Sequence, residues 1–287
     1  MRSLLFVPAD SEKKLGKAPE SGADVLLLDL EDSVALARKP AARQLTAEYL
    51  ARRPAGGPQY YVRVNALDSG LTLADLAAVM PGKPDGLILP KCNSAADVQL
   101  LGHYLDALEA REAIEAGRTR ILPIATETAA ALFALGSYVN AGPRLIGLSW
   151  GAEDLAAAVG ASTNRRADGA FDDLFRLARS LCLAGAAAAD VLPVDTVFTD
   201  FRDMAGLEAE AAAARRAGFR AKMAIHPGQV EAINRAFMPT AAECEWAERV
   251  VAAYAAAPDA GVVALDGKML DRPHLKQALR LLDRPTH

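Results

Sequence analysis

The sequence predicts an α/β fold, and within that class a (β/α)8 TIM barrel followed by a C-terminal helical extension. Short apolar runs rich in β-branched residues alternate with longer helix-like stretches, which indicates right-handed crossovers and a parallel sheet. Eight such units fit in a chain of 287 residues, a length suited to one large barrel or two smaller domains. The turn after the first apolar run lacks the GxGxxG pattern of a doubly wound fold, so the barrel is favoured.

The predicted strands are the apolar runs that precede helix-like stretches. They lie at residues 3–7, 25–30, 60–64, 86–90, 121–125, 145–149, 193–196 and 222–225. The helices expected between them cover residues 11–21, 40–52, 95–116, 129–139, 171–189 and 207–217. The chain then continues well beyond the eighth strand, with a helical stretch near residues 241–256. We therefore expect a catalytic barrel at residues 1–240 and an extension at residues 241–287.

The composition limits the classes of partner. Hydrophobic residues make up 52% of the chain and charged residues 24%, which is typical of a globular protein with a buried core. The formal net charge of −4 predicts no nucleic-acid partner. The apolar run at residues 4–7 is too short for a signal peptide or a membrane span, so no membrane association is expected. Cys92, Cys182 and Cys244 form no CxxC pair and are expected to be reduced thiols in a cytoplasm.

Polar side chains follow nearly every predicted strand. Active sites of (β/α)8 barrels lie at the carboxyl ends of the strands, so these residues are the candidates for a functional site. Charges gathered at one rim must be paired or bound to something, because burying them alone is costly. In chain order the candidates are Asp29, Glu31, Asp32, Arg63, Asn65, Lys91, Glu127, Glu153, Asp154, Asp195 and His226.

Carboxylates after the fifth and sixth strands predict a magnesium site. Glu127 and the pair Glu153-Asp154 each follow a strand and precede an alanine-rich run. Mg²⁺ keeps several waters and takes only a few protein oxygens, so two carboxylates are enough to hold it. Arg63 offers a planar fork that suits a substrate carboxylate. Metal-assisted chemistry on an oxyanion is therefore the first hypothesis.

Each candidate also has a structural interpretation. Asp29, Glu31 and Asp32 could cap the following helix, and Arg63 could be their ion-pair partner. Lys91 could be a solvated loop charge. Glu127 could be a charge at the N-terminus of a helix, and His226 could be a hydrogen-bonded structural histidine. Asp195 could act through its neighbours.

The segment Gly147-Leu148-Ser149-Trp150-Gly151 matches the GxSxG pattern of a serine hydrolase nucleophile. Asp195 and His226 follow it in the order that an α/β-hydrolase triad requires. Against this alternative, no HGGG-like oxyanion loop precedes the serine, and the carboxylates described above would have no use. A pattern with three fixed positions also arises easily by chance. The serine hydrolase is therefore the weaker hypothesis.

Eight segments resemble the citrate lyase β-subunit family, in the wider group that includes malyl-CoA and citramalyl-CoA lyases. They span almost the whole chain in the expected order. They are RSLLFVPA at 2–9, LDLEDSV at 28–34, RVN at 63–65, LPK at 89–91, ETA at 127–129, GAEDL at 151–155, KMAIHP at 222–227 and DGKMLDRP at 266–273.

The resemblance implies a (β/α)8 barrel with Mg²⁺ held by Glu127 and Asp154, and a carboxylate or keto acid bound by Arg63. It implies an Asp271 acid/base group on a C-terminal segment that closes over a neighbouring subunit's site, in a homotrimer or higher homo-oligomer. Asp29 and Glu31 would support Arg63, which completes the predicted catalytic set. The substrate-binding set predicted with them is Arg63, Glu127, Asn65 and Lys91.

The reaction implied is reversible aldol cleavage of a 3-hydroxy-dicarboxyl-CoA thioester such as malyl-CoA or citramalyl-CoA. The products would be acetyl-CoA and a 2-keto acid, so the expected ligands are acyl-CoA and small keto acids. Related pyruvate aldolases carry a histidine where this chain has Asp32, which favours the thioester branch. Ala221 replaces a frequent glycine beside Lys222, which leaves the role of that lysine open.

Other functions are also compatible with these residues. Condensation followed by thioester hydrolysis, as in a malate synthase, could use the same site. A Schiff-base aldolase could use Lys91 or Lys222. From a different class, the chain could be a non-catalytic subunit or substrate-binding protein in a lyase complex. Arg165-Arg166 is a candidate phosphate contact for CoA, although a solvated loop charge is the favoured interpretation.

Overall fold

The computed structural model describes residues 1–54, 56–258 and 260–282. Contacts divide the chain into two compact units, Met1–Ala236 and Phe237–His287. Each unit has its own hydrophobic core. Within the described part of the chain, none of the helices combines the length and apolar character needed to cross a bilayer.

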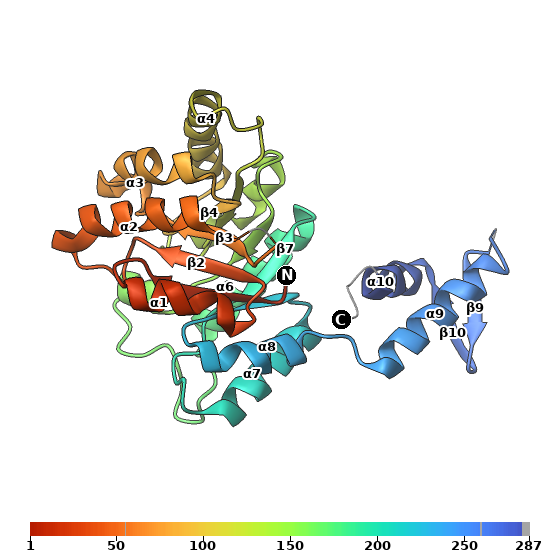
Figure 1. Cartoon of the computed structure of the whole chain (residues 1–287). Coiled ribbons are helices and arrows are strands. Elements are labelled where there is room, and N and C mark those ends of the chain that lie inside the picture. Colours follow the sequence, from red (N-terminus) through yellow and green to blue (C-terminus); the bar gives the residue numbers. More distant parts are fainter. Residues whose placement is uncertain (55, 259, 283–287) are drawn as a thin grey trace. The chain divides into compact units, whose positions relative to one another are not determined.

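The first unit is built around eight parallel strands, coloured from red to blue in Figure 1. Their bounds are β1 Ser3–Pro8, β2 Val25–Asp29, β3 Gln59–Arg63, β4 Gly86–Leu89, β5 Arg120–Pro123, β6 Gly147–Ser149, β7 Leu192–Asp195 and β8 Ala221–Ala224. Consecutive strands pair in parallel, and β1 also pairs with β8. Parallel bridges from Ile121 to Leu145 and from Ile124 to Ser149 join β5 to β6. The sheet therefore closes on itself, which confirms the predicted barrel.

The helices surround the strands, as Figure 1 shows for α1 to α4 and α6 to α8. Their bounds are α1 Glu12–Lys17, α2 Lys39–Arg52, α3 Thr72–Val79, α4 Ala95–Arg111, α5 Glu153–Val159, α6 Asp173–Ala188, α7 Met204–Ala217 and α8 Val230–Ala236. Several short 3-10 turns complete this layer. They are η1 Ala18–Ser21, η2 Leu36–Arg38, η3 Leu67–Ser69, η4 Met80–Gly82, η5 Ala131–Phe133, η6 Leu135–Asn140 and η7 Pro227–Gln229.

The helix predicted at residues 129–139 is wrong, because this segment forms the 3-10 turns η5 and η6. Leu135 and Tyr138 are the buried residues of η6, and their spacing of three matches the tighter 3-10 repeat. The carbonyl oxygen of Leu135 would lie 3.0 Å from a Cβ added at Gly185 of α6. Close packing of α6 on η6 thus overrides the helix propensity of the alanine-rich sequence.

Side-chain alternation along the strands decides which residues reach the barrel interior. Val25 and Leu27 belong to the central apolar cluster, so Asp29 lies on the same face of β2. Tyr61 belongs to the same cluster, so Arg63 follows it on β3. The apolar cluster therefore leaves Asp29 and Arg63 at the carboxyl end of the barrel interior.

The second unit contains α9 Ala241–Ala255, the antiparallel hairpin of β9 Val262–Leu265 and β10 Lys268–Asp271, and α10 Arg272–Leu282. The α9 helix confirms the predicted helical stretch. Asp266 and Gly267 both have positive φ, as a two-residue hairpin turn of this type requires. Buried residues from all four elements form its core: Ala247, Val250, Tyr254, Val263, Leu270 and Ala278.

The close contact of β6 with β7 gives a test of the barrel packing. A Cβ on Gly147 would lie 2.6 Å from the carbonyl oxygen of Leu192. Gly147→Ala should therefore lower the free energy of unfolding by about 1–3 kcal/mol, measured by urea denaturation. Gly136→Ala is the matched control, because no atom lies within 4 Å of its added Cβ. Equal stability of the two variants would contradict this packing.

Candidate active site at the barrel mouth

A fixed guanidinium lies at the mouth of the barrel. Arg63 donates from Nε to Asp29 Oδ1 at 2.7 Å and from Nη2 to Oδ2 at 2.6 Å, and its Nη1 lies 2.9 Å from Glu31 Oε2. Its guanidinium also stacks 4.6 Å above the ring of Phe6. Burial alone would raise the pKa of Asp29, but the bonds and charge of Arg63 lower it. This ion pair holds a positive charge in one orientation.

Lys91 connects the acids of several strand exits. Its ammonium group pairs with Glu31, with Asp32 at 3.4 Å and with Asp154 at 3.2 Å. Its backbone N–H donates to Glu127 Oε2 at 2.5 Å, from a residue with a positive φ of 51°. Burial would lower the pKa of Lys91, but the bond to Glu31 and the nearby acids raise it above its usual value. The amine therefore stays protonated, which disfavours a Schiff-base role.

Glu127 is a buried carboxyl group at the mouth whose pKa is raised. Its side chain is almost fully buried after β5, with 4% exposure. Its pKa is raised to about 8, chiefly by burial and also by the nearby Asp154 and Glu31, although the N–H bond and the charge of Lys91 oppose this shift. A Cβ at Gly151 would lie only 2.6 Å from Glu127 Cγ, so glycine is required where the chain passes this carboxylate. The positive charge near Glu127 is therefore too small to keep the pKa of its carboxyl group at the usual value.

These residues fit a hard divalent cation. Glu127 and Asp154 supply carboxylate oxygens from neighbouring strand exits, close enough for one to raise the pKa of the other. No cluster of three or more His, Cys, Asp or Glu side chains able to hold a metal occurs in residues 1–54, 56–258 and 260–282. A site of two carboxylates completed by water suits Mg²⁺ in particular, because this ion retains much of its hydration shell.

A cavity of about 320 Å³ opens beside these groups. Charged groups line one part of it, and apolar side chains line the rest. The lining includes Phe6, Asp29, Asp32, Arg63, Ile124, Glu127, Trp150, Glu153, Asp154, Met223 and Ile225. Its volume suits a small organic acid better than a whole nucleotide-bearing ligand.

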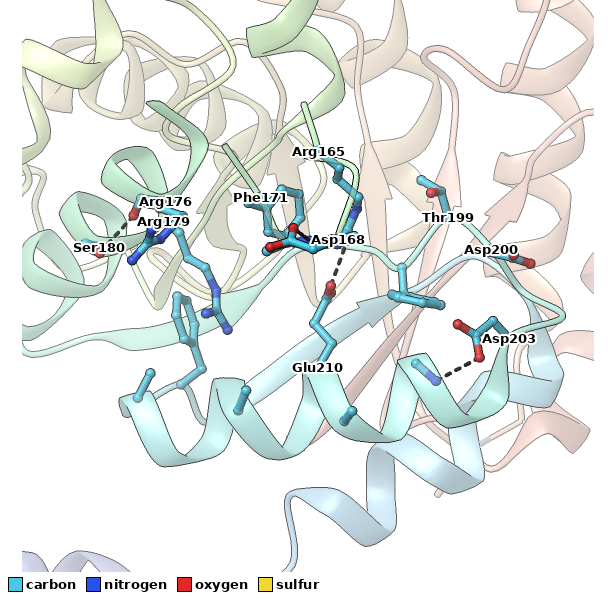
Figure 2. A pocket seen from close by; sticks show the side chains of 18 of the residues that line it. Arg165, Asp168, Phe171, Arg176, Arg179, Ser180, Thr199, Asp200, Asp203 and Glu210 are labelled. Carbon is cyan, nitrogen blue, oxygen red and sulfur yellow. Dashed lines mark hydrogen bonds and ion pairs between the residues drawn. The ribbon is translucent and has the colours of Figure 1, made fainter. Parts of the chain in front are cut away.

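A larger cavity of about 810 Å³ lies between α6 and α7 (Figure 2). Three arginines line it, and each is already paired with a carboxylate. Arg165 bonds to Glu210 at 2.9 Å, Arg179 to Asp195 at 3.0 Å, and Arg176 to Asp173 at 3.3 Å. Since these charges are compensated, the cavity is a weaker candidate for an anionic substrate than the barrel mouth. Its lining includes Arg165, one of the two candidate contacts for a CoA phosphate, but not Arg166.

Two other candidates, Asn65 and Glu153, form hydrogen bonds within the protein. The side-chain amide of Asn65 donates to the Leu30 carbonyl at 3.1 Å and to Asp75 Oδ2 at 2.7 Å. Glu153 accepts a bond from Asn164 at 2.8 Å. The amide of Asn65 is thus engaged within the protein, and its contact with substrate stays a prediction.

Asp271 belongs to the second unit, at the end of β10. Its carboxylate lies 2.6 Å from Nδ1 of His274, and its side chain is about half exposed. An exposed carboxylate on a separate unit is available to another surface. Its predicted acid/base role stays a prediction.

The geometry does not assemble the hydrolase triad. The hydroxyl of Ser149 is fully buried and lies 3.5 Å from the sulfur of Met223. Asp195 is bound by Trp150, Arg179 and Lys222. The ring of His226 caps the turn that follows it and stacks on Phe201 at 5.1 Å. Each member therefore has a different partner, so the GxSxG match is fortuitous.

Two further residues near the site were not among the sequence candidates. Lys39 is buried at the start of α2 and donates to the carbonyls of Leu30 and Glu31, both at 2.8 Å. Trp150 lines the cavity and donates through Nε1 to Asp195 at 2.8 Å. No sequence pattern points to Lys39, whereas Trp150 lies within the segment that matches GxSxG, between Ser149 and Gly151.

A family model for HpcH/HpaI aldolase/citrate lyase matches residues 2–227, which cover the strands and mouth residues of the barrel. The chain belongs to this family. The resemblance inferred from the sequence motifs is therefore confirmed. The family relates the chain to carbon–carbon lyases, and the same residues that match carry the Arg63, Glu127 and Asp154 cluster.

Individual relatives extend over nearly the whole chain. A citrate lyase subunit beta-like protein of Mycobacterium tuberculosis (strain H37Rv) is 37% identical over 280 residues, 98% of this chain and 94% of the relative. A (3S)-malyl-CoA thioesterase of Cereibacter sphaeroides (strain KD131) is 35% identical, with 98% and 93% covered. The crystal structure of CitE from M. tuberculosis with magnesium, acetoacetate and coenzyme A matches with a TM-score of 0.77 and 36% identity, covering 98% of this chain and 96% of that one.

The raised pKa of Glu127 predicts a pH effect on the metal-free protein. The folded pKa of about 8 lies above the usual value near 4.5. The folded state therefore holds this proton more tightly, and the resulting stability is present at low pH and lost as the pH rises through about 8. In EDTA, the free energy of unfolding of the wild type should fall relative to that of Glu127→Gln as the pH rises from about 4.5 to about 8. Chemical denaturation at several pH values measures it, and parallel curves for the two proteins would contradict it.

Proposed function

We propose that this protein is a Mg²⁺-dependent carbon–carbon lyase that cleaves a 3-hydroxy-dicarboxyl-CoA thioester, such as citramalyl-CoA or malyl-CoA, into acetyl-CoA and a 2-keto acid. The single observation that carries the proposal is the buried Glu127, whose pKa is raised to about 8 beside Asp154, at the mouth that also holds Arg63. Further support comes from the related CitE, which was crystallised with magnesium, acetoacetate and coenzyme A, and also with magnesium and pyruvate.

In this proposal Arg63 binds the carboxylate of the keto-acid half. Its contacts to Asp29 and Glu31 use only part of the donors of a guanidinium, so N–H groups remain for a substrate. Because both partners hold it in place, no reorganisation is needed when negative charge develops. Asp29 and Glu31 thus act by orienting Arg63, while Lys91 places its N–H on Glu127.

Glu127 and Asp154 would hold the metal. When bound there, Mg²⁺ supplies Lewis-acid polarisation of the oxygen on the keto-acid half and a template for its carboxylate. The Glu127 proton must leave before the carboxylate can bind a cation, so its raised pKa makes metal affinity pH-dependent. The absence of a side chain at Gly151 leaves room for the Glu127 side chain beside the backbone.

Asp271 is the proposed acid/base group. In the cleavage direction the hydroxyl loses its proton to water and becomes the keto group, the bond between the hydroxyl-bearing carbon and the thioester α-carbon breaks, and the electron pair of that bond forms an enolate on the thioester. Asp271 then donates a proton to the α-carbon to give acetyl-CoA. Its half-exposed carboxylate on a compact unit of its own supports delivery from outside the barrel. We propose that the unit closes over the site of a neighbouring subunit, in a homotrimer or a higher homo-oligomer.

A second candidate is condensation or cleavage followed by thioester hydrolysis at the same site. The (3S)-malyl-CoA thioesterase that is 35% identical over nearly the whole chain favours it. Product analysis distinguishes the two reactions. Free malate or citramalate would support hydrolysis, whereas acetyl-CoA with glyoxylate or pyruvate would support the lyase. For localisation we propose a reducing cytoplasm, since Cys92, Cys182 and Cys244 are all free thiols.

Two variants test the division of roles. Glu127→Gln should lose Mg²⁺ binding, because it removes a charged ligand, and it should lose turnover with it. Asp271→Asn should bind Mg²⁺ as the wild type does but lose turnover by a factor of about 10²–10⁴, as expected for a general acid or base. Calorimetry with Mg²⁺ and assays with malyl-, methylmalyl-, citramalyl- and citryl-CoA measure these effects.

The control is Asp266→Asn, a charge removal on the hairpin turn next to β10 that leaves Asp271 intact. It should keep both metal binding and turnover. Full activity of Asp271→Asn would remove the acid/base assignment. Turnover of all four thioesters in EDTA would contradict the metal-dependent mechanism, and turnover of none by the wild type with Mg²⁺ would favour a non-catalytic subunit.

A further inference from the structure

A buried ion pair lies on the outer face of the barrel, behind the candidate active site. Asp195 of β7 and Lys222 of β8 are register partners, and Lys222 Nζ donates to Asp195 Oδ2 at 3.0 Å. The two side chains are 1% and 0% exposed. Their neighbours Val194 and Met223 belong to the interior cluster, so the pair points toward the surrounding helices.

Two of those helices complete the partners of the pair. Lys222 also donates to Glu210 of α7 at 2.9 Å, and Arg179 of α6 donates to Asp195 Oδ1 at 3.0 Å. Figure 2 shows Glu210 turned toward Arg165, with which its carboxylate is paired, at the wall of the large cavity. Burial would raise the pKa of Asp195, but Lys222 and Arg179 lower it, so the group remains a charged acceptor.

Trp150 connects this ion pair to the barrel mouth. Its indole Nε1 donates to Asp195 Oδ1 at 2.8 Å, and its ring packs edge-on against Phe171 with centroids 5.0 Å apart. The next residue, Gly151, passes so near Glu127 that an added Cβ would lie 2.6 Å from Glu127 Cγ, and its N–H donates to the hydroxyl of Thr126 at 3.1 Å. Asp154 follows within the same segment, at the start of α5.

We propose that Asp195 is a positioning residue for metal binding, which it supports by holding Trp150 and thereby fixing the segment 150–154 against Glu127. The inference rests on the proposed Mg²⁺ site. A charge-assisted bond to a buried carboxylate restrains the indole more firmly than a neutral bond would. Gly151 has no side chain to anchor it, so the indole of Trp150 on one side and the Thr126 hydroxyl on the Gly151 N–H hold this part of the loop.

The role differs from simple stabilisation of the barrel. A buried ion pair often adds little net stability, because desolvation offsets the attraction. By contrast, removing a group that orients a metal ligand through a hydrogen bond lowers metal affinity by about 10–100-fold. Metal affinity, compared with the stability of the metal-free protein, therefore separates the two roles.

Trp150→Phe is the first test, because it keeps an aromatic ring beside Phe171 but removes the N–H donor. We expect Mg²⁺ affinity measured by calorimetry to fall about tenfold or more. Glu210→Gln is the matched control. It alters a contact of Lys222 on the far side of the pair, yet leaves the bond from Trp150 to Asp195 in place. It should bind Mg²⁺ as the wild type does, even if its melting temperature falls.

A fluorescence measurement keeps the test independent of how well Trp150→Phe folds. The chain has two tryptophans, Trp150 and Trp246, so Trp246→Phe leaves Trp150 as the sole indole. Mg²⁺ should change its emission with the affinity found by calorimetry. Adding Asp195→Asn to this background should shift that midpoint to about tenfold higher Mg²⁺.

The outcomes are distinguishable. Absence of Mg²⁺ binding by the wild type would overturn the proposed metal site and this inference with it. If the wild type binds Mg²⁺ but both Trp150→Phe and Asp195→Asn bind it equally well, the positioning role alone is overturned. An emission from Trp150 that does not respond to bound Mg²⁺ would overturn it as well.

Discussion

Burial of the Glu127 carboxylate beside other acids is the constraint on which the rest of the site depends. A charged carboxylate removed from water must either take a proton or face a cation, and the neighbouring Asp154 and Glu31 favour neutralisation further. Lys91 supplies one N–H bond to Glu127, but its ammonium group is occupied by Glu31, Asp32 and Asp154. A divalent cation is the group that best completes this arrangement.

The two faces of the strands carry different ion pairs. Interior positions bring Asp29 and Arg63 to the mouth above an apolar core, whereas exterior positions bring Asp195 and Lys222 together under the helices. Both pairs are register partners on adjacent strands. Strand registration therefore fixes the geometry of the site more tightly than loops alone could, as precise ligand placement requires.

In the proposed mechanism, the second unit supplies the acid/base group that we do not assign at the barrel mouth. Arg63 and the carboxylates can bind and polarise a substrate, but the barrel cavity contains no side chain that we assign as acid/base toward the thioester carbon. In the proposed mechanism that group is Asp271, on a unit with its own core and its own hairpin. Delivery of a catalytic group by a separate unit couples chemistry to closure, as in many enzymes whose lids complete the site.

The sequence by itself determined the barrel, the order of its eight strands and the identity of the charged residues at their ends, because side-chain periodicity and strand–helix alternation are local properties. The sequence also suggested that Arg63 pairs with Asp29 and Glu31, but the tertiary structure decided which charges meet. Strand registration brings Arg63 to Asp29, and burial raises the pKa of Glu127, and neither follows from neighbours in the chain. The 3-10 turns at η5 and η6, and the bond from Trp150 to Asp195, likewise depend on packing between distant segments.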